Sequence, residues 1–295
     1  MLLAVVALWG VTFVLVKDAL KDTAPLLFNF LRMSVAALAL IFLNRRHLRH
    51  IPRRTIASGA IVGLFLAAGY QFQTAGLART TASKSAFITS LVVVIVPLLT
   101  AIPAVRPASA PAPGIATLLG AFLAFAGLMF LTTPTGTTWS NLITSVGVGD
   151  LLTLLCAIAF AGHLIALAHT SPQVPIPQLA TLQILFAALV MGATLSLGGP
   201  IYFSMTPRVI VALAVTGLFA TATAFTIQSW AQRHLSPSHT ALLLTLEPVF
   251  AWLTSFFFLG EQFGSRSFVG ALLILLGILV TELLPLSSPV SKHPL

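Results

Sequence analysis

Long apolar stretches alternate with short polar breaks along almost the whole chain. Ten stretches have about 20 residues, the length at which an α-helix crosses the hydrocarbon core of a bilayer. They lie near residues 2–19, 24–43, 55–76, 84–103, 113–132, 147–168, 176–197, 207–230, 239–259 and 266–284. The breaks between them are rich in proline and glycine and too short for a soluble domain. The pattern therefore predicts an all-α membrane protein with ten transmembrane helices.

The composition supports this prediction, because the chain lacks the charge that a soluble surface needs. Of its 295 residues, 58% are hydrophobic and 7% are charged, whereas a soluble domain carries about 25% charged residues. The outer surface must therefore face lipid. The single cysteine, Cys156, excludes an intrachain disulfide bond, and its apolar surroundings favour a packing role.

The second half of the chain repeats features of the first. The segment GAFLAFAG at 120–127 recurs as GALLILLG at 270–277, and Gln73 recurs as Gln228. A duplicated apolar block of about 150 residues is typical of transporters built from two internal repeats. The expected units are a first five-helix repeat over residues 1–133, a second over 147–284 and a disordered tail over 285–295. Because five is odd, the second repeat would enter the membrane inverted. The glycines, seven residues apart, share a helix face and indicate close packing of the fifth and tenth helices.

Basic residues gather in one predicted loop, which sets the expected orientation. The loop after the second helix and the start of the third carry Arg45, Arg46, Arg49, Arg53 and Arg54. Short loops rich in lysine and arginine remain on the cytoplasmic side, so we expect this loop and both termini to be cytoplasmic. The formal net charge of +9 is also found in nucleic-acid-binding proteins. Here, however, the basic residues lie at helix ends rather than along one face, so no nucleic-acid partner is expected.

Several short motifs resemble one known family. They are WGVTF at 9–13, TASKSAFITSL at 81–91, LEPVFA at 246–251 and FLGE at 258–261. Their order, spacing and duplication are similar to the EamA family of the drug/metabolite transporter superfamily, over essentially residues 2–284. The resemblance implies two inverted five-helix repeats around a central cavity, lined mainly by helices 1, 3, 4, 6, 8 and 9. It also implies transport of small metabolites, often outward, across a bacterial cytoplasmic membrane.

Charged side chains within the predicted helices are few and therefore informative. A charge at membrane depth costs roughly 2.5–3.5 kcal/mol on insertion scales, so each one needs a partner, water or a purpose. Glu247 precedes Pro248, where the first half of the chain has Val96. It is either a site for a proton or a substrate amine, or a carboxylate that caps a loosened backbone. Lys84 either attracts an anionic group of the substrate or reaches interfacial water.

Polar and aromatic residues complete the candidate site. Gln73 and Gln228 are candidate gates, with hydrogen bonding between helices as the alternative. His163 is a candidate ligand because imidazole titrates near neutral pH, although a nearby backbone or hydroxyl partner would also explain it. Arg32 is expected to make a structural ion pair or carbonyl contact, with contact to the substrate as the alternative. The full set of candidate substrate-binding residues is Trp9, Thr12, Phe13, Tyr70, Gln73, Lys84, Thr89, His163, Thr221, Gln228 and Glu247.

The predicted function is secondary transport, in the export direction, of small organic metabolites such as amino acids or related amphipathic compounds. Proton coupling through Glu247 is a hypothesis. The alternatives are a membrane-embedded enzyme and a passive channel. The chain has no His-Glu-x-x-His, Gly-x-Ser-x-Gly or phosphate-loop motif, and no ring of like charges typical of a channel filter. We therefore expect no enzyme activity, cofactor or metal, and as partners a small-molecule substrate and the lipid bilayer.

Overall fold

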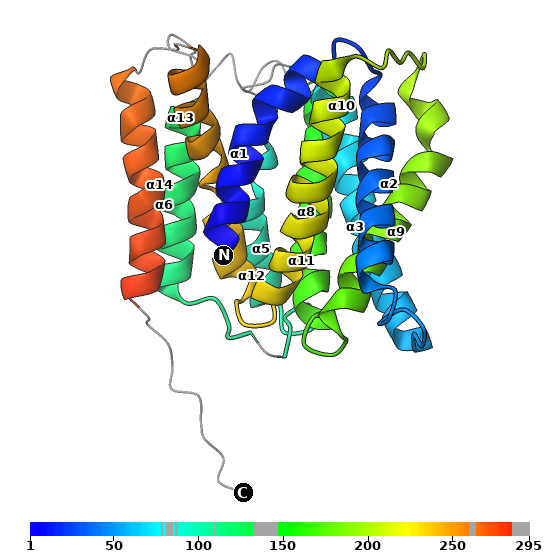
Figure 1. The fold of residues 1–295 in the computed structure, drawn as a ribbon. Coiled ribbons are helices and arrows are strands. Elements are labelled where there is room, and N and C mark those ends of the chain that lie inside the picture. Colours follow the sequence, from blue (N-terminus) through cyan, green and yellow to red (C-terminus); the bar gives the residue numbers. More distant parts are fainter. Residues whose placement is uncertain are drawn as a thin grey trace, which may run out of the picture.

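The chain folds as a bundle of helices that lie side by side and run alternately up and down (Figure 1). The computed structural model describes residues 1–77, 79–80, 85, 88–108, 110–132, 147–259 and 264–284. Over these ranges no named β-strand forms, and Thr23 and Phe203 meet in an isolated β-bridge. The all-α prediction is therefore confirmed over the described residues, whereas the predicted tail at 285–295 lies outside them.

The helices follow the predicted apolar stretches closely. In chain order they are α1 (Leu2–Ala19), α2 (Pro25–Asn44), α3 (Arg53–Leu77), α5 (Val92–Ala101), α6 (Ile115–Thr132), α8 (Val148–Thr170), α9 (Ile176–Ala193), the 3₁₀-helix η1 (Leu195–Gly198), α10 (Pro207–Ala214), the π-helix η2 (Val215–Thr223), α11 (Ala224–Ala231), α12 (Pro237–Leu244), α13 (Glu247–Leu259) and α14 (Ser265–Leu283). Five segments are long and apolar enough to cross a membrane, and they are Pro25–Asn44, Arg53–Gly76, Val148–Thr170, Ile176–Ala193 and Pro207–Ala231. The last of these joins α10, η2 and α11 into one span.

One predicted helix is broken in the structure. The sequence predicted a single helix over 239–259, but α12 ends at Leu244 and α13 begins at Glu247. The amides of the two residues between them bond to carbonyls three residues earlier, at 3.1 and 3.2 Å. Pro248 has no N–H, so it cannot donate to the carbonyl of Leu244 as an α-helix requires. The helix predicted over 239–259 is therefore two helices, and the break between them lies directly before Glu247.

The predicted helix over 84–103 also differs from the structure. Ser85, Ile88 and Thr89 are helical, a turn follows at Ser90 and Leu91, and α5 begins at Val92. Residues 84, 86 and 87 lie outside the described part of the chain. Pro97 lies inside α5, where the hydroxyl of Thr100 bonds to the Pro97 carbonyl at 3.2 Å. Both halves of the chain thus carry a proline within or beside an interrupted helix.

The loops of the bundle meet at two opposite ends. At the end that we call the arginine end, the loop after α2 contacts the first turn of α9, and the first turn of α3 contacts the loop after α8. There Gln178 Nε2 donates to the carbonyls of His47 at 2.7 Å and His50 at 3.1 Å, and the side chain of Arg54 bonds to Gln173. Arg233 joins the same end by donating to the carbonyls of residues 171 and 174, at 2.8 and 2.6 Å.

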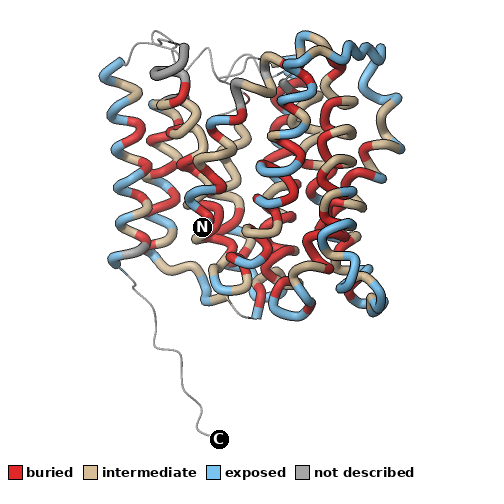
Figure 2. The backbone as a smooth tube through the Cα atoms, viewed as in Figure 1, coloured by how far each residue is buried: buried red, intermediate tan, exposed pale blue. Residues whose placement is uncertain are grey.

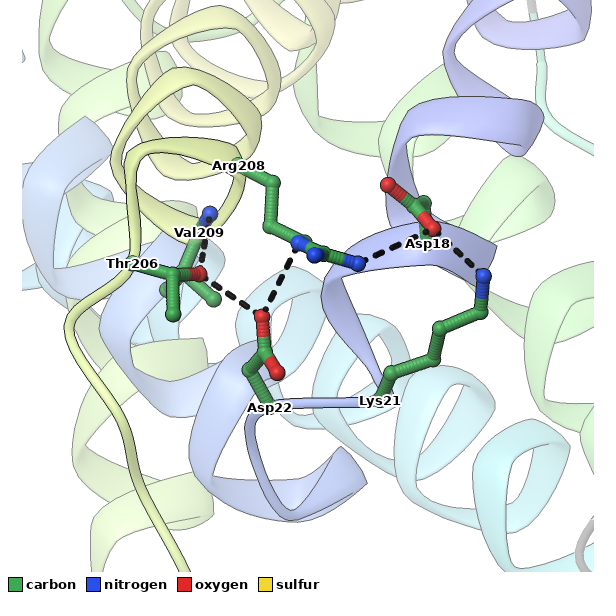
Figure 3. Close-up of polar contacts among 6 residues, drawn as sticks. All are labelled: Asp18, Lys21, Asp22, Thr206, Arg208 and Val209. Atoms are coloured by element: carbon green, nitrogen blue, oxygen red, sulfur yellow. Dashed lines mark hydrogen bonds and ion pairs between the residues drawn. The ribbon is translucent and has the colours of Figure 1, made fainter.

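At the other end, which we call the aspartate end, the loop after α1 contacts the loop before α10 (Figure 3). Asp22 accepts from Thr206 Oγ1 at 2.7 Å and lies 3.2 Å from Arg208 Nε. Asp18 lies 2.7 Å from Lys21 Nζ and 3.6 Å from Arg208 Nη1. Because α1 ends at the aspartate end and α8 ends at the arginine end, these two helices run in opposite directions.

The repeated glycine motifs pack against each other. A Cβ atom added to Gly127 would lie 2.5 Å from the carbonyl oxygen of Gly270, and one added to Gly277 would lie 2.5 Å from that of Gly120. The pairing of early with late residues means that α6 and α14 are antiparallel. Small residues let helix backbones approach closely in lipid, and this contact agrees with the packing expected from the seven-residue spacing.

Burial follows the expectation for a lipid-facing bundle. Buried residues line the inner faces of the helices, and exposed ones lie on the outside and at the ends (Figure 2). Many exposed residues are large and apolar, such as Leu38, Phe42, Phe122 and Leu272. A soluble monomer rarely exposes so much contiguous apolar surface, so this outer surface is suited to lipid.

Candidate functional site

Arg32 lies at the centre of a polar cluster between α2, α3 and η2. Only 7% of this residue is exposed. Its Nε donates to Thr221 Oγ1 at 2.6 Å, and its Nη2 donates to the Tyr70 hydroxyl and to the Ala220 carbonyl, both at 3.2 Å. The guanidinium carbon also lies 5.1 Å from the centroid of the Tyr70 ring. Three helices thus fix one positive charge inside the bundle.

The π-helix η2 provides the backbone acceptor of this cluster. The amide of Ala224 bonds to the carbonyls three and five residues earlier and leaves out Ala220, which an α-helix would use. The Ala220 carbonyl instead accepts from Trp9 Nε1 at 2.7 Å and from Arg32. π-helical turns are frequent at functional sites. Here the wider turn frees an oxygen that holds α1 and α2 against the same point.

Glu247 supplies the opposite charge. It is the first residue of α13, directly after the break from α12, and it is half-buried. Its charge interacts with that of Arg32 and acts on the Tyr70 hydroxyl, yet the two charged side chains do not form an ion pair. Helix α1 packs closely here, since a Cβ on Gly10 would lie 2.8 Å from the Glu247 carbonyl oxygen.

Aromatic rings lie beside these charges. The centroids of Trp9 and Phe225 are 5.5 Å apart, and Tyr70 meets Phe160 edge-on at 5.6 Å. Trp9, Tyr70 and Phe160 are half-buried. The cluster therefore combines two opposite charges with apolar surface, a combination that suits an amphipathic organic molecule.

Other predicted residues lie near this cluster without joining it. The Thr12 hydroxyl donates to the carbonyl of Trp9 at 3.1 Å and is buried in its own helix turn. Gln73 is half-buried on α3. Thr89 lies 3.9 Å from the sulfur of Cys156, across from α8. These positions neither exclude nor require contact with a substrate.

His163 belongs to a separate buried network. Its Nε2 lies 3.2 Å from Gln183 Oε1, and Gln183 Nε2 donates to Ser229 Oγ at 2.8 Å. All three side chains are buried. The partner of His163 is thus a side-chain amide rather than the backbone or hydroxyl group of the alternative interpretation, and this network ties α8 to α9 and α11.

Gln228 of α11 and Gln232, the residue directly after this helix, lie towards the arginine end. Gln228 Nε2 donates to Gln232 Oε1 at 3.4 Å, and Gln232 Nε2 donates to the carbonyl of Leu164 at 2.9 Å. Gln228 is buried, and its Oε1 has no hydrogen-bond partner among the described residues. Beyond them a cavity of about 280 Å³ opens at the arginine end, lined by Gln232, Arg233 and residues up to His239.

Arg32 has a larger place in the site than its sequence position indicated. A structural contact was the favoured expectation for it, and its carbonyl contact is confirmed, but it also occupies the centre of the cluster. An arginine inside an apolar helix was the signal for it. Lys84 lies outside the described residues, and so does the side chain of Phe13.

Comparisons with known proteins agree on one family. A model of the EamA-like transporter family matches residues 1–133 and 147–283. An uncharacterized transporter of Archaeoglobus fulgidus is 32% identical over 282 residues, which cover 95% of this chain and 84% of the relative. The uncharacterized transporter YoaV of Bacillus subtilis is 25% identical and is covered, like this chain, over 94% of its length. A chloroplastic WAT1-related protein of Arabidopsis thaliana is 26% identical over 92% of this chain and 66% of its own.

A solved crystal structure has the same fold. It superposes with a TM-score of 0.77 over 95% of each chain, at 18% sequence identity. Together with the apolar spans, these matches identify a multi-pass membrane protein that transports a solute. The chain belongs to the EamA-like transporter family.

Proposed function

We propose that this protein is a secondary carrier that exports small amphipathic metabolites, such as amino acids, from a bacterial cytoplasm by alternating access. The observation that carries this proposal is the pair of opposite charges, Arg32 and Glu247, held inside the bundle beside aromatic rings and an interrupted helix. Carriers place their substrate sites near the bilayer midplane, at helix breaks between repeats. A charge retained at that depth usually serves binding or coupling.

The proposed mechanism is rocking of two inverted repeats around this site. Two features support the inversion. The repeated glycine motifs pair antiparallel, with Gly120 against Gly277 and Gly127 against Gly270. Moreover, α1 and α8, the first helices of the two expected repeats, run in opposite directions. The loop contacts at the arginine and aspartate ends would then serve as equivalent closures, which open in turn.

The proposed orientation has the arginine end in the cytoplasm. It carries the cluster from Arg45 to Arg54 as well as Arg233, and short basic loops favour the inner side of the membrane. Substrate would enter through the cavity at the arginine end, along Gln232 and Gln228, and leave at the aspartate end. We also propose that Glu247 exchanges a proton, because an ionisable group retained at membrane depth usually serves binding or coupling and Glu247 has no ion-pair partner among the described residues.

Counterflow in proteoliposomes tests the carrier proposal. Vesicles with purified protein are loaded with excess unlabelled amino acid, and uptake of a labelled trace of the same compound is followed. In a carrier, unlabelled compound inside the vesicle speeds the uptake of the label, because the binding site returns to the outer face with a molecule bound. The rate of uptake also saturates as the concentration rises. A channel gives flux without acceleration from the far side, and an enzyme would convert the compound. Flux without trans-acceleration across a panel of amino acids would overturn the proposal.

A further inference from the structure

The hydrogen-bond partners of Arg32 carry no charge. All three of its hydrogen-bond acceptors, Thr221 Oγ1, the Tyr70 hydroxyl and the Ala220 carbonyl, are neutral oxygens. Glu247 interacts with Arg32 through space but forms no ion pair with it. A buried cation is normally paired with an anion, because desolvation of an unpaired charge is costly. The cluster is therefore incomplete as an ionic site.

The geometry of the guanidinium indicates what is missing. Nε and Nη2 are occupied, whereas Nη1 has no hydrogen-bond partner among the described residues. It is also absent from the polar atoms that are both fully buried and unpartnered, so the residual exposed surface of Arg32 is available at this nitrogen. A planar guanidinium with free N–H groups matches a carboxylate better than any other small anion of metabolism except phosphate.

We infer that Arg32 is the residue that selects substrates bearing a carboxylate, which binds at Nη1 and completes the charge balance of the site. This inference rests on the proposed carrier function and adds the chemical class of the head group. The hydrogen bonds to Thr221, Tyr70 and Ala220 hold the guanidinium in place before substrate arrives, so little side-chain entropy is lost on binding. The apolar body of the substrate would lie against Trp9 and Tyr70.

The inference reassigns a role that the sequence analysis gave to Lys84. Arg32 lies deep in the bundle and is 7% exposed, so its attraction for an anion is less screened by water than that of an interfacial lysine. A carboxylate bound at Arg32 would also leave Glu247 on the opposite side for a substrate amine or a proton. The same solute would thereby meet both charges.

Matched ligands test the inference directly. The probes are L-leucine, in which the carboxylate is present, and L-leucinamide, in which it is replaced by a neutral amide. Alanine and phenylalanine give two further pairs with smaller and larger bodies. Apparent affinity is measured by thermal shift of the purified protein and by competition in counterflow. For the best-bound pair we expect the carboxylate to bind at least about tenfold more tightly than the amide, the size of a charge-assisted hydrogen bond.

Arg32→Gln should abolish this ratio by weakening the amino acid while leaving the amide unchanged. Arg32→Lys keeps the charge but not the planar guanidinium, so it should reduce only the affinity for the carboxylate ligand. It replaces Arg32→Gln as the test if that variant does not fold. The control is Arg79→Gln, an exposed arginine that also donates to a carbonyl, that of Ala75 at 2.9 Å. It should keep the wild-type ratio.

The outcomes separate the inference from the proposal beneath it. If the amino acid and its amide both showed counterflow with equal affinity, the carrier proposal would hold and the role of Arg32 in selecting a carboxylate would be overturned. That role would also be overturned if an Arg32 variant lost both ligands in parallel, since such a pattern indicates a structural contact. Counterflow of no member of any pair would contradict the carrier proposal for amino acids, and this inference with it.

Discussion

The contact between α2 and η2 and the contact between α9 and α3 occupy matching places in the two halves of the chain, yet two matched pairs of positions in them are polar in the first and apolar in the second. Aligning the helix-initial prolines Pro25 and Pro177 pairs Arg32 with Ile184. The alignment of Gln73 with Gln228 pairs Thr221 with Leu66 in the same way. Arg32 and Thr221 are hydrogen-bonded, whereas Ile184 and Leu66 are fully buried members of one apolar cluster.

The interrupted helices differ in the same sense. Glu247 precedes Pro248 at the start of α13, whereas Val96 precedes Pro97 and is fully buried in an apolar cluster with Leu164. The duplicated positions therefore share backbone features, but the charges occur once. Each charge at membrane depth costs free energy, so one polar centre destabilises the bundle less than two would. The two halves thus share their helix arrangement, whereas the charged residues occur in only one of each matched pair of positions.

The largest effect is expected where the two halves are most alike. Gly127→Leu would place a side chain where even a Cβ lies 2.5 Å from the Gly270 oxygen and 2.8 Å from the Ile274 amide. Since backbone cannot move aside as a flexible side chain can, α6 and α14 must separate. Overpacking costs about 1–3 kcal/mol in a typical core and more against backbone. Yield of monodisperse protein and its melting temperature in detergent should both fall sharply.

The control for this change is Gly147→Ala, at a glycine with a negative φ where an added Cβ meets nothing within 4 Å. Its melting temperature should match that of the wild type. If Gly127→Leu melted like this control, the close glycine contact would not hold the scaffold.

A smaller but more specific effect is expected at the charge that occurs once. Glu247→Gln keeps the size of the side chain and removes its charge and its proton exchange. We expect counterflow to fall by about an order of magnitude, on the scale of a lost charged hydrogen bond, and its pH dependence to disappear. Stability should change little, because Glu247 makes no ion pair among the described residues. The measurement is counterflow at several pH values beside a melting curve.

Asp150→Asn provides the matched carboxylate. Asp150 accepts from the Gly147 amide at 2.8 Å and from Thr80 Oγ1 at 2.6 Å at the start of α8. This variant should lower stability by the loss of a helix cap, about 1 kcal/mol, and keep the pH dependence. Full counterflow with unchanged pH dependence in Glu247→Gln would reject proton coupling at this residue.

The sequence predicted those parts of this comparison that depend on one stretch of chain. The lengths of the apolar stretches predicted the helices, and the seven-residue spacing of the glycines predicted the contact between α6 and α14. Glu247 was a candidate because it is a lone carboxylate before Pro248. The Arg32–Thr221 bond joins residues 189 positions apart, and no local pattern signals it. The π-helix that frees the Ala220 carbonyl could not be predicted from the sequence either, because a change in the hydrogen-bond register of a helix leaves its apolar pattern intact. Pro248 predicted a loosened backbone beside Glu247, and the structure shows a full interruption between two helices there.

The smallest effect is expected at the acceptor that distinguishes the two matching contacts. Thr221→Val makes η2 resemble its counterpart at Leu66 and removes the 2.6 Å bond to Arg32 Nε. Hydrogen bonds between membrane helices contribute about 0.6–1.7 kcal/mol, so we expect affinity for a carboxylate substrate to fall roughly three- to tenfold. Thr226→Val is the matched change on the same span, because the Thr226 hydroxyl bonds at 2.7 Å to a carbonyl of its own helix. Equal losses in both variants would mean that Thr221 supports the helix and not the guanidinium. In that case, the difference between the two contacts would be one of packing and not of function.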